Sequence, residues 1–286
     1  MNNTIIMGAV AYDPKVVTIW DGFKAWFKER GLDFDYVLYE NYERQVESHF
    51  KGHYDVAWNS PLAWLQVKAI AEKLGRKAEA IAMRDTDCDL TSVIVVRTDS
   101  GIESIEDLRG KSIGVGAGDS PQATLIPLVH LAEAGLDPSN DLQVRRFDVL
   151  VGKHGDHIGG ERDAAKALMQ GEVDAACMID GNHLLFGREG TLPSGSTRVL
   201  GQTGEYDHCN FTILDDAPEQ AIQQFRELLL SMSYDDPAVR PLLDLEGLKV
   251  WKEGRTDHYA LLERAVARFG TIDAFVDDVA LRCGER

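Results

Sequence analysis

The sequence has no long hydrophobic run and few basic residues for its length. None of its 286 residues belongs to a stretch of about 18 apolar residues, so we expect no membrane insertion. Lys and Arg number 30 against 47 Asp and Glu, which gives a formal net charge of -17. Because nucleic acids and anionic membranes attract basic surfaces, this charge disfavours both as partners.

Cysteine is also scarce, and no two cysteines are close together in the sequence. The four cysteines are Cys88, Cys177, Cys209 and Cys283, and no CxxC pair occurs. This pattern predicts neither a zinc knuckle nor a redox dithiol, and we expect no cofactor and no dedicated metal motif. Free thiols are typical of a reducing compartment.

The N-terminus lacks the marks of a secretory leader. Residues 1–3 lead almost directly into an apolar, strand-like segment at residues 5–10, without a basic region or a long apolar region before it. As written, the sequence therefore predicts no signal peptide and a cytoplasmic location. If a leader had been removed, the location would be periplasmic.

Length and periodicity together predict an α/β protein of two domains. A chain of 286 residues exceeds most single cores. Strand-like and helix-like segments alternate along most of it, which favours mostly parallel sheets flanked by helices. The predicted strands are 5–10, 35–39, 54–58, 92–97, 112–116, 143–147, 173–179, 197–203 and 210–214. The predicted helices are 16–30, 42–50, 61–74, one opening at 120, 161–170 and 258–269.

Four segments resemble the periplasmic solute-binding proteins of phosphonate, phosphate and phosphite transporters. They are residues 54–58, 105–116, 118–124 and 163–175. The resemblance implies a two-lobed type II periplasmic-binding-protein fold that closes on a small polar ligand in the cleft between its lobes. It also implies an ABC transporter permease as a partner.

The resemblance further implies how the chain divides between the lobes. Residues 1–92 and 212–286 would form one lobe, and residues 93–211 the other. Two crossing strands, near 92–97 and 208–214, would join them as hinges.

A glycine-rich turn at residues 116–119 opens the helix at Ser120. Backbone N–H groups at a helix start, together with Ser120, Gln122 and Thr124, suit an anion. Related proteins seat a phosphonate or carboxylate there. The alternative is that Ser120 only caps its helix.

Polar and aromatic residues follow the first strands of the predicted sheet. Asn59 and Ser60 come just after the strand 54–58, where open α/β sheets bind ligands. Tyr12 and Tyr42 stand in loops after the first two strands and are candidates for the same cleft, or for ordinary packing. We expect Trp58 and Trp64 in the core.

The loop at residues 152–162 is rich in glycine, histidine and acidic residues. His154, His157 and Glu161 are candidate ligand contacts, and Asp156 lies between the histidines. These residue types also suit a transition metal, but their spacing matches no metal motif. A hydrogen-bonding loop and a merely solvated loop are the other interpretations.

Three carboxylates point to the chemistry of the ligand. By the resemblance, Glu161 stands where the family usually has a ligand-contacting histidine, which disfavours phosphonate itself, and Asp207 stands where the family often places a ligand-binding aspartate. Asp180 follows the strand 173–179. Buried carboxylates that converge require a cationic partner, so we expect an anionic or zwitterionic ligand, and a zwitterion would satisfy both the helix start and the carboxylates.

The alternative function is a cytoplasmic enzyme on the same fold, such as a lyase, decarboxylase or dehydratase, whose reaction could be assisted by a metal. Its catalytic candidates are Glu161, His157, His208 and Cys209, with His154 beside them. Because neighbouring strand residues point to opposite faces, we expect that His208 and Cys209 do not form a dyad with each other. Cys209 would need a distant histidine as its base, or is a core residue.

Overall fold

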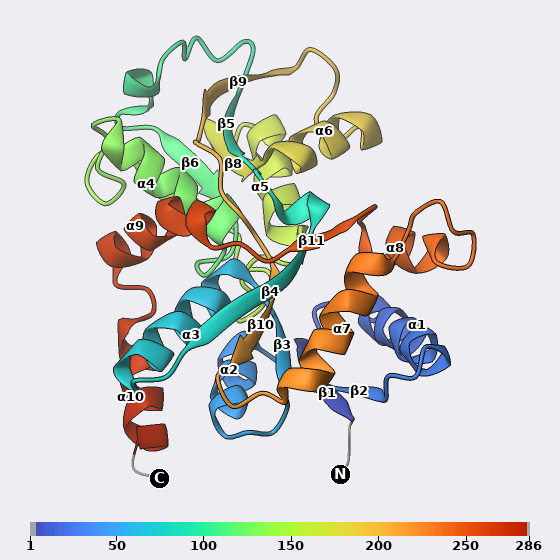
Figure 1. Ribbon diagram of the computed structural model, residues 1–286. Coiled ribbons are helices and arrows are strands. Elements are labelled where there is room, and N and C mark those ends of the chain that lie inside the picture. Colours follow the sequence, from blue (N-terminus) through green and yellow to red (C-terminus); the bar gives the residue numbers. More distant parts are fainter. Residues whose placement is uncertain (1–3, 285–286) are drawn as a thin grey trace. The chain divides into compact units, whose positions relative to one another are not determined.

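The computed structural model describes residues 4–284 and divides the chain into two compact units (Figure 1). Unit 1 contains residues up to Cys88, then Asp207–His258, and the C-terminal segment from Ile272. Unit 2 contains Asp89–Tyr206 and Tyr259–Thr271. No helix of the described residues is long and apolar enough to cross a membrane.

Unit 1 is built on a six-stranded mixed sheet with the strand order β11-β4-β10-β3-β1-β2. β1 pairs in parallel with β2 and β3, whereas β10 runs antiparallel to both β3 and β4, and β11 antiparallel to β4. The strands are β1 (Ile5–Val10), β2 (Phe34–Tyr39), β3 (Val56–Asn59), β4 (Ala78–Arg84), β10 (Asn210–Leu214) and β11 (Trp251–Glu253).

An aromatic core packs against one face of this sheet. Phe211 on β10 lies 4.7 Å from Trp58 and 5.1 Å from Phe225, measured between ring centroids. The helices are α1 (Lys15–Glu29), α2 (Tyr42–Phe50), α3 (Pro61–Lys73), α7 (Glu219–Ser231), α8 (Arg240–Glu246) and α10 (Asp273–Gly284). Helices α1 and α7 supply buried residues to this core, and α2 and α3 contribute none to it. Trp58 and Trp64 are buried, as predicted.

Unit 2 is built on a five-stranded mixed sheet with the order β7-β6-β8-β5-β9. β6 pairs in parallel with β7 and β8, and β5 pairs antiparallel with β8 and β9. The strands are β5 (Ser92–Arg97), β6 (Ser112–Val115), β7 (Gln143–Arg146), β8 (Ala175–Ile179) and β9 (Thr197–Gln202).

Both faces of the unit 2 sheet are covered, which explains the continuous apolar run of β5. Val93 and Val95 face one hydrophobic cluster, and Ile94 and Val96 face the other. The first cluster includes residues of α5 (Gly159–Gln170) and α6 (Asp180–Glu189), and the second includes residues of α4 (Ile126–Glu133). A short π-helical segment, Pro121–Leu125, precedes α4.

The observed grouping differs from the predicted division at both predicted boundaries and at residues 259–271. The chain passes between the units at residues 88/89, 206/207, 258/259 and 271/272, so β5 lies wholly in unit 2 and β10 wholly in unit 1. Helix α9 (Ala260–Phe269), predicted to return to the first lobe, groups with unit 2. Phe269 of α9 packs against a hydrophobic cluster of unit 2, and Arg264 contacts Glu133 of α4 at 2.8 Å.

Two strands escaped the sequence analysis. β4 is rich in alanine and β11 has only three residues, so neither shows a strong strand pattern. β4 matters for function because it ends at Arg84, which belongs to a buried polar cluster described below.

Candidate functional site

The carboxyl edge of the unit 2 sheet gathers most of the candidate residues of that unit. The parallel strands β6, β7 and β8 all end there, and Ser92 at the start of β5 pairs with Ile179 at the end of β8. This is the edge at which open α/β sheets bind ligands. The candidates on the segments that follow are Ser120, Gln122, Thr124, His154, His157, Glu161 and Asp180.

The hydroxyl groups of the glycine-rich turn bond within the turn itself. Ser120 Oγ accepts a hydrogen bond from the backbone N–H of Ala123 at 3.2 Å, so Ser120 is a helix cap. Thr124 Oγ1 donates to the carbonyl of Ala117 at 2.8 Å. Both residues are only 1% exposed.

The loop at residues 148–155 is tied to this turn. Gln122 Nε2 donates to the carbonyl of Gly155 at 2.7 Å, and the backbone N–H of Gly118 donates to Asp148 at 2.9 Å. Gly155 has φ +77, and a Cβ atom at this position would overlap Ser120 Oγ. The loop therefore seats its own backbone on the residues predicted to hold an anion.

The same loop contains unusual backbone conformations. Leu150 and His154 have positive φ values of 55 and 49, which are uncommon for residues other than glycine. His154 is fully buried, and His157 Nδ1 accepts from the backbone N–H of Gly159 at 3.0 Å. The surrounding contacts hold strained residues, a feature that often accompanies functional loops.

Glu161 and Asp180 place two carboxylates at this edge. Glu161 is 2% exposed, and its Oε2 accepts from the backbone N–H of Ile179 at 3.0 Å and from Asn182 at 2.8 Å. Asp180 accepts from Thr91 Oγ1 at 3.0 Å. Burial raises the pKa of Tyr206, and the negative charges of Glu161 and Asp180 raise it further. The edge therefore has a negative local field.

In unit 1, the corresponding edge holds Asn59 and Ser60 in structural roles. Asn59 is fully buried, accepts from Gln45 Nε2 at 2.8 Å and donates to Thr212 Oγ1 at 2.9 Å. Ser60 caps α3 by accepting from the backbone N–H of Ala63 at 3.1 Å.

The two candidate tyrosines of unit 1 differ in exposure. Tyr42 is 1% exposed at the start of α2. Tyr12 is half-buried against the aromatic core, with Lys15 Nζ 5.9 Å from its ring centroid. Of the two, Tyr12 is the more accessible.

Asp207 lies in unit 1, and its charge is balanced there. Arg255 donates to both of its carboxylate oxygens, through Nε at 2.7 Å and Nη2 at 2.7 Å. Asp207 is thus not in the same unit as Glu161 and Asp180, and it is paired with a cation rather than adding a free negative charge to them.

His208 and Cys209 contact each other, contrary to the expectation, made when we predicted that they form no dyad, that their side chains point to opposite faces. His208 Nδ1 lies 3.1 Å from Cys209 Sγ. The alternation rule failed because both residues precede β10, which begins at Asn210, and are not part of a regular strand.

The same imidazole nitrogen also approaches a carboxylate that the sequence analysis missed. His208 Nδ1 lies 3.4 Å from Asp87 Oδ1. In a catalytic triad, the acid and the nucleophile contact opposite nitrogens of the histidine. Since Cys209 and Asp87 both face Nδ1, this arrangement is not a triad.

Arg84 links this group to a second acid. It donates to Asp87 through Nε at 2.5 Å and Nη2 at 2.9 Å, and to Glu246 Oε1 through Nη1 at 3.1 Å. Burial opposes ionisation of Asp87, but the charge of Arg84 and the hydrogen bonds from His208 and Arg84 lower the pKa of Asp87 to about 2. Asp87 is therefore ionised near neutral pH, and Arg84 pairs with two buried carboxylates.

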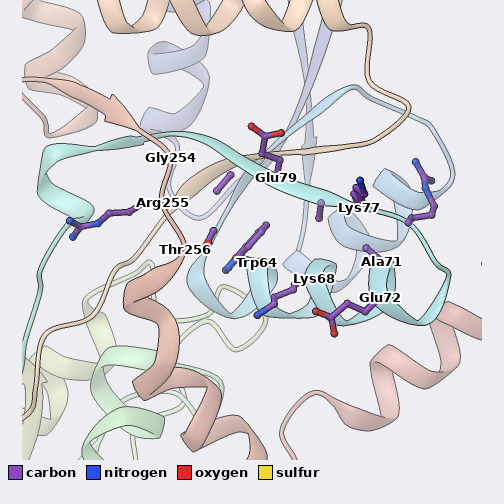
Figure 2. Close-up of a pocket in the computed structure, with 12 residues that line it drawn as sticks. Trp64, Lys68, Ala71, Glu72, Lys77, Glu79, Gly254, Arg255 and Thr256 are labelled. Carbon is purple, nitrogen blue, oxygen red and sulfur yellow. The ribbon is translucent and has the colours of Figure 1, made fainter.

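The described part of unit 1 also has a pocket of about 520 Å³ between α3, β4 and residues 254–256 (Figure 2). Trp64, Lys68, Glu72 and Lys77 are among the side chains that line it. It adjoins Ala78–Ala80, at the opposite end of β4 from Arg84. None of the predicted ligand contacts lines this pocket, but Arg255, the partner of Asp207, does.

Comparison with known proteins identifies the family. Residues 8–259 match the family described as the periplasmic substrate-binding protein of the phosphonate ABC transporter. The chain belongs to this family. Its members are solute-binding proteins with small-molecule ligands and a transporter partner, which confirms the predicted family and general function; the enzyme alternative is not favoured.

Solved structures confirm the type II periplasmic-binding-protein fold. PhnD1 from Prochlorococcus marinus (MIT 9301), in complex with methylphosphonate, matches with a TM-score of 0.70 and 17% identity over 94% of this chain and 99% of that one. A binding protein component of an ABC phosphonate transporter from Pseudomonas aeruginosa matches with a TM-score of 0.62 and 15% identity, over 99% and 98% of the two chains. XAC2383 from Xanthomonas citri, bound to ATP, matches with a TM-score of 0.67 and 15% identity, over 97% and 98%.

Proposed function

We propose that this solute-binding protein recognises a small zwitterion, with an anionic group and an amine, and presents it to an ABC transporter permease. The observation that carries the proposal is the buried carboxylate of Glu161 at the carboxyl edge of the unit 2 sheet. A solute with only an anionic group would be repelled by this charge, whereas an ammonium group would be attracted.

The acidic end of the edge would hold the amine. Glu161 is held in place by hydrogen bonds from the backbone N–H of Ile179 and from Asn182. Asp180, on the next element, would add a second negative charge. An ammonium group has three donors, so it can contact two carboxylates at once.

The start of the helix at Ser120 would hold the anionic end. Helix N-termini attract anions through their backbone dipoles, even where the capping hydroxyl is already used. His157 comes from a segment at the same edge and can donate a hydrogen bond. Gln122 and the fully buried His154 would shape this end of the site, Gln122 through its bond to the carbonyl of Gly155. Thr124 would support the turn through its bond to Ala117.

In unit 1, Tyr12 is the proposed direct contact because it is half-buried. Tyr42, Asn59 and Ser60 are nearly or fully buried, and we assign them the role of holding the edge in shape. Asp207 would act together with Arg255. Because their charges cancel, the pair is neutral rather than acidic.

The test uses two ligands that differ by one ammonium group. Ethylphosphonate and 2-aminoethylphosphonate are titrated into chelator-treated protein by calorimetry, with inorganic phosphate as a third ligand. We expect the amine to improve affinity about tenfold or more, which corresponds to about 1.4 kcal/mol. Equal affinities, or tighter binding of ethylphosphonate, would contradict the proposal.

A further inference from the structure

The buried cluster in unit 1 brings together three different metal-binding side chains. Asp87, His208 and Cys209 are 1%, 8% and 2% exposed, and one ligand atom of each lies within 4.8 Å of the others. His208 Nδ1 is 3.1 Å from Cys209 Sγ and 3.4 Å from Asp87 Oδ1. Ligand atoms bound at 2.0–2.3 Å around one tetrahedral ion are separated by roughly such distances.

The backbone holds the three ligands in place. The N–H of His208 donates to the carbonyl of Asp87 at 2.8 Å, which joins the segment after β4 to the segment before β10. Asp87 ends a short 3-10 helix, Asp85–Asp87. The ligands therefore sit on two segments that are tied together independently of any ion.

Residues around the ligands orient them in the way that outer-shell partners orient metal ligands. Arg84 donates to both oxygens of Asp87 and also to Glu246 Oε1. Its guanidinium lies 5.1 Å from the ring centroid of Trp58. Such contacts fix the rotamer of a ligating carboxylate.

The donor set selects the class of ion. A thiolate and an imidazole suit Zn²⁺ and similar transition metals, whereas Mg²⁺ and Ca²⁺ prefer oxygen ligands alone. We propose that Asp87, His208 and Cys209 form a transition-metal site of the zinc class, with three protein ligands and a fourth position for water or a solute atom.

Cobalt provides the direct test because a thiolate bound to Co²⁺ gives an intense charge-transfer absorption band. Chelator-treated full-length protein is titrated with Co²⁺, and then with Zn²⁺ to displace it. We expect one Co²⁺ per chain, a sulfur-to-cobalt band, and loss of the band on adding Zn²⁺. Absence of the band in the wild-type protein would overturn the proposal.

Matched variants assign the band to this cluster. Cys209→Ser should abolish it and His208→Gln should weaken Co²⁺ binding at least tenfold, whereas Cys283→Ser, on α10 away from these ligands, should leave it unchanged. A band that survives Cys209→Ser, or that Cys283→Ser removes, contradicts the assignment. Circular dichroism confirms that each variant is folded.

A second measurement, of the melting temperature, keeps the proposal testable if Cys209→Ser does not fold. Zn²⁺ that binds only the folded state raises the melting temperature. We expect Zn²⁺ to raise the Tm of the wild-type protein and of Cys283→Ser, and to raise that of His208→Gln clearly less; no shift in the wild-type protein, or an equal shift in all three, would overturn the proposal. The result is independent of solute binding, which is measured on chelator-treated protein.

Discussion

The carboxyl edges of the two sheets are built differently. At the edge of unit 1, Arg84 pairs with Asp87 and Glu246, and His208 and Cys209 complete a buried cluster. At the edge of unit 2, a glycine-rich loop with positive-φ residues packs its backbone on Ser120 and Gln122.

The difference shows that the equivalent edges of two sheets in one fold can be stabilised by different interactions. The unit 1 edge is held by side-chain charges that compensate each other, so removing one charge exposes another. The loop at the unit 2 edge is held by backbone contacts and a helix cap, so we expect the stability of this loop to depend on shape more than on charge. Substitutions that alter only charge or only shape should separate the two edges.

The largest expected effect comes from removing the central charge of unit 1. Arg84→Gln would leave Asp87 and Glu246 buried without their cation, which should lower the free energy of unfolding by about 3–5 kcal/mol. Denaturant unfolding measures the change. The control, Arg226→Gln, breaks a pair with the exposed Glu253 and should cost less than about 1 kcal/mol. Similar losses in both variants would contradict the account.

A buried histidine outside the edges gives unit 1 a pH dependence of its own. His49 is 3% exposed, and burial lowers its pKa from 6.5 to about 4. The unfolded chain binds a proton at His49 more readily than the folded protein does. The contribution of His49 to the free energy of unfolding is therefore complete above pH 6.5 and decreases by about 3 kcal/mol in total as the pH falls from 6.5 to 4.

The pH effect of His49 is isolated by comparison with His49→Gln. The difference in unfolding free energy between wild type and variant should shrink or reverse between pH 7 and pH 4. A difference that does not change with pH would show that His49 is not buried in its neutral form.

Shape is tested at the loop of unit 2. Gly155→Ala adds a methyl group that would overlap Ser120 Oγ, at a φ of +77. Gly195→Ala is the control, because Gly195 has φ +75 but no atom near the position of a Cβ. The shared backbone strain cancels, and the clash should cost Gly155→Ala about 1–3 kcal/mol more. Equal losses would mean that the loop is not seated on Ser120.

The smallest predicted effect concerns the helix cap at the same edge. Ser120→Ala removes the acceptor for the backbone N–H of Ala123 and should cost about 1 kcal/mol of stability. Ser194→Ala, at an exposed position, should change the stability by less than about 0.5 kcal/mol. Thermal or denaturant unfolding measures both changes. An unchanged stability in Ser120→Ala would contradict the role of Ser120 as a helix cap.

The sequence was most informative where local pattern and structure agree. The apolar run of β5 and the helical spacing of α1 follow from burial of both faces of a strand and one face of a helix. The cap at Ser120 was also foreseen, as one of two alternatives. The segments quoted for the family resemblance lie within the matched residues, which is why the family was recognisable.

The contacts between distant segments could not be predicted from one sequence. Asp87 meets His208 and Cys209 only because β4 and β10 are neighbours in the sheet, and β4 itself has a weak strand pattern. The pairing of Asp207 with Arg255 likewise depends on tertiary structure. The close contact between the backbone of residues 148–155 and Ser120 could not be predicted either, because apart from the glycines no local sequence pattern indicates it.

The most direct test of the proposed function combines the ligand pair with one substitution. The affinities of ethylphosphonate and 2-aminoethylphosphonate are measured by calorimetry for the wild-type protein and for Glu161→Gln, which keeps the shape but removes the charge. We predict that the wild-type protein prefers the amine about tenfold or more and that Glu161→Gln loses most of this preference. A preference that is absent in the wild-type protein, or that persists unchanged in Glu161→Gln, would contradict the account.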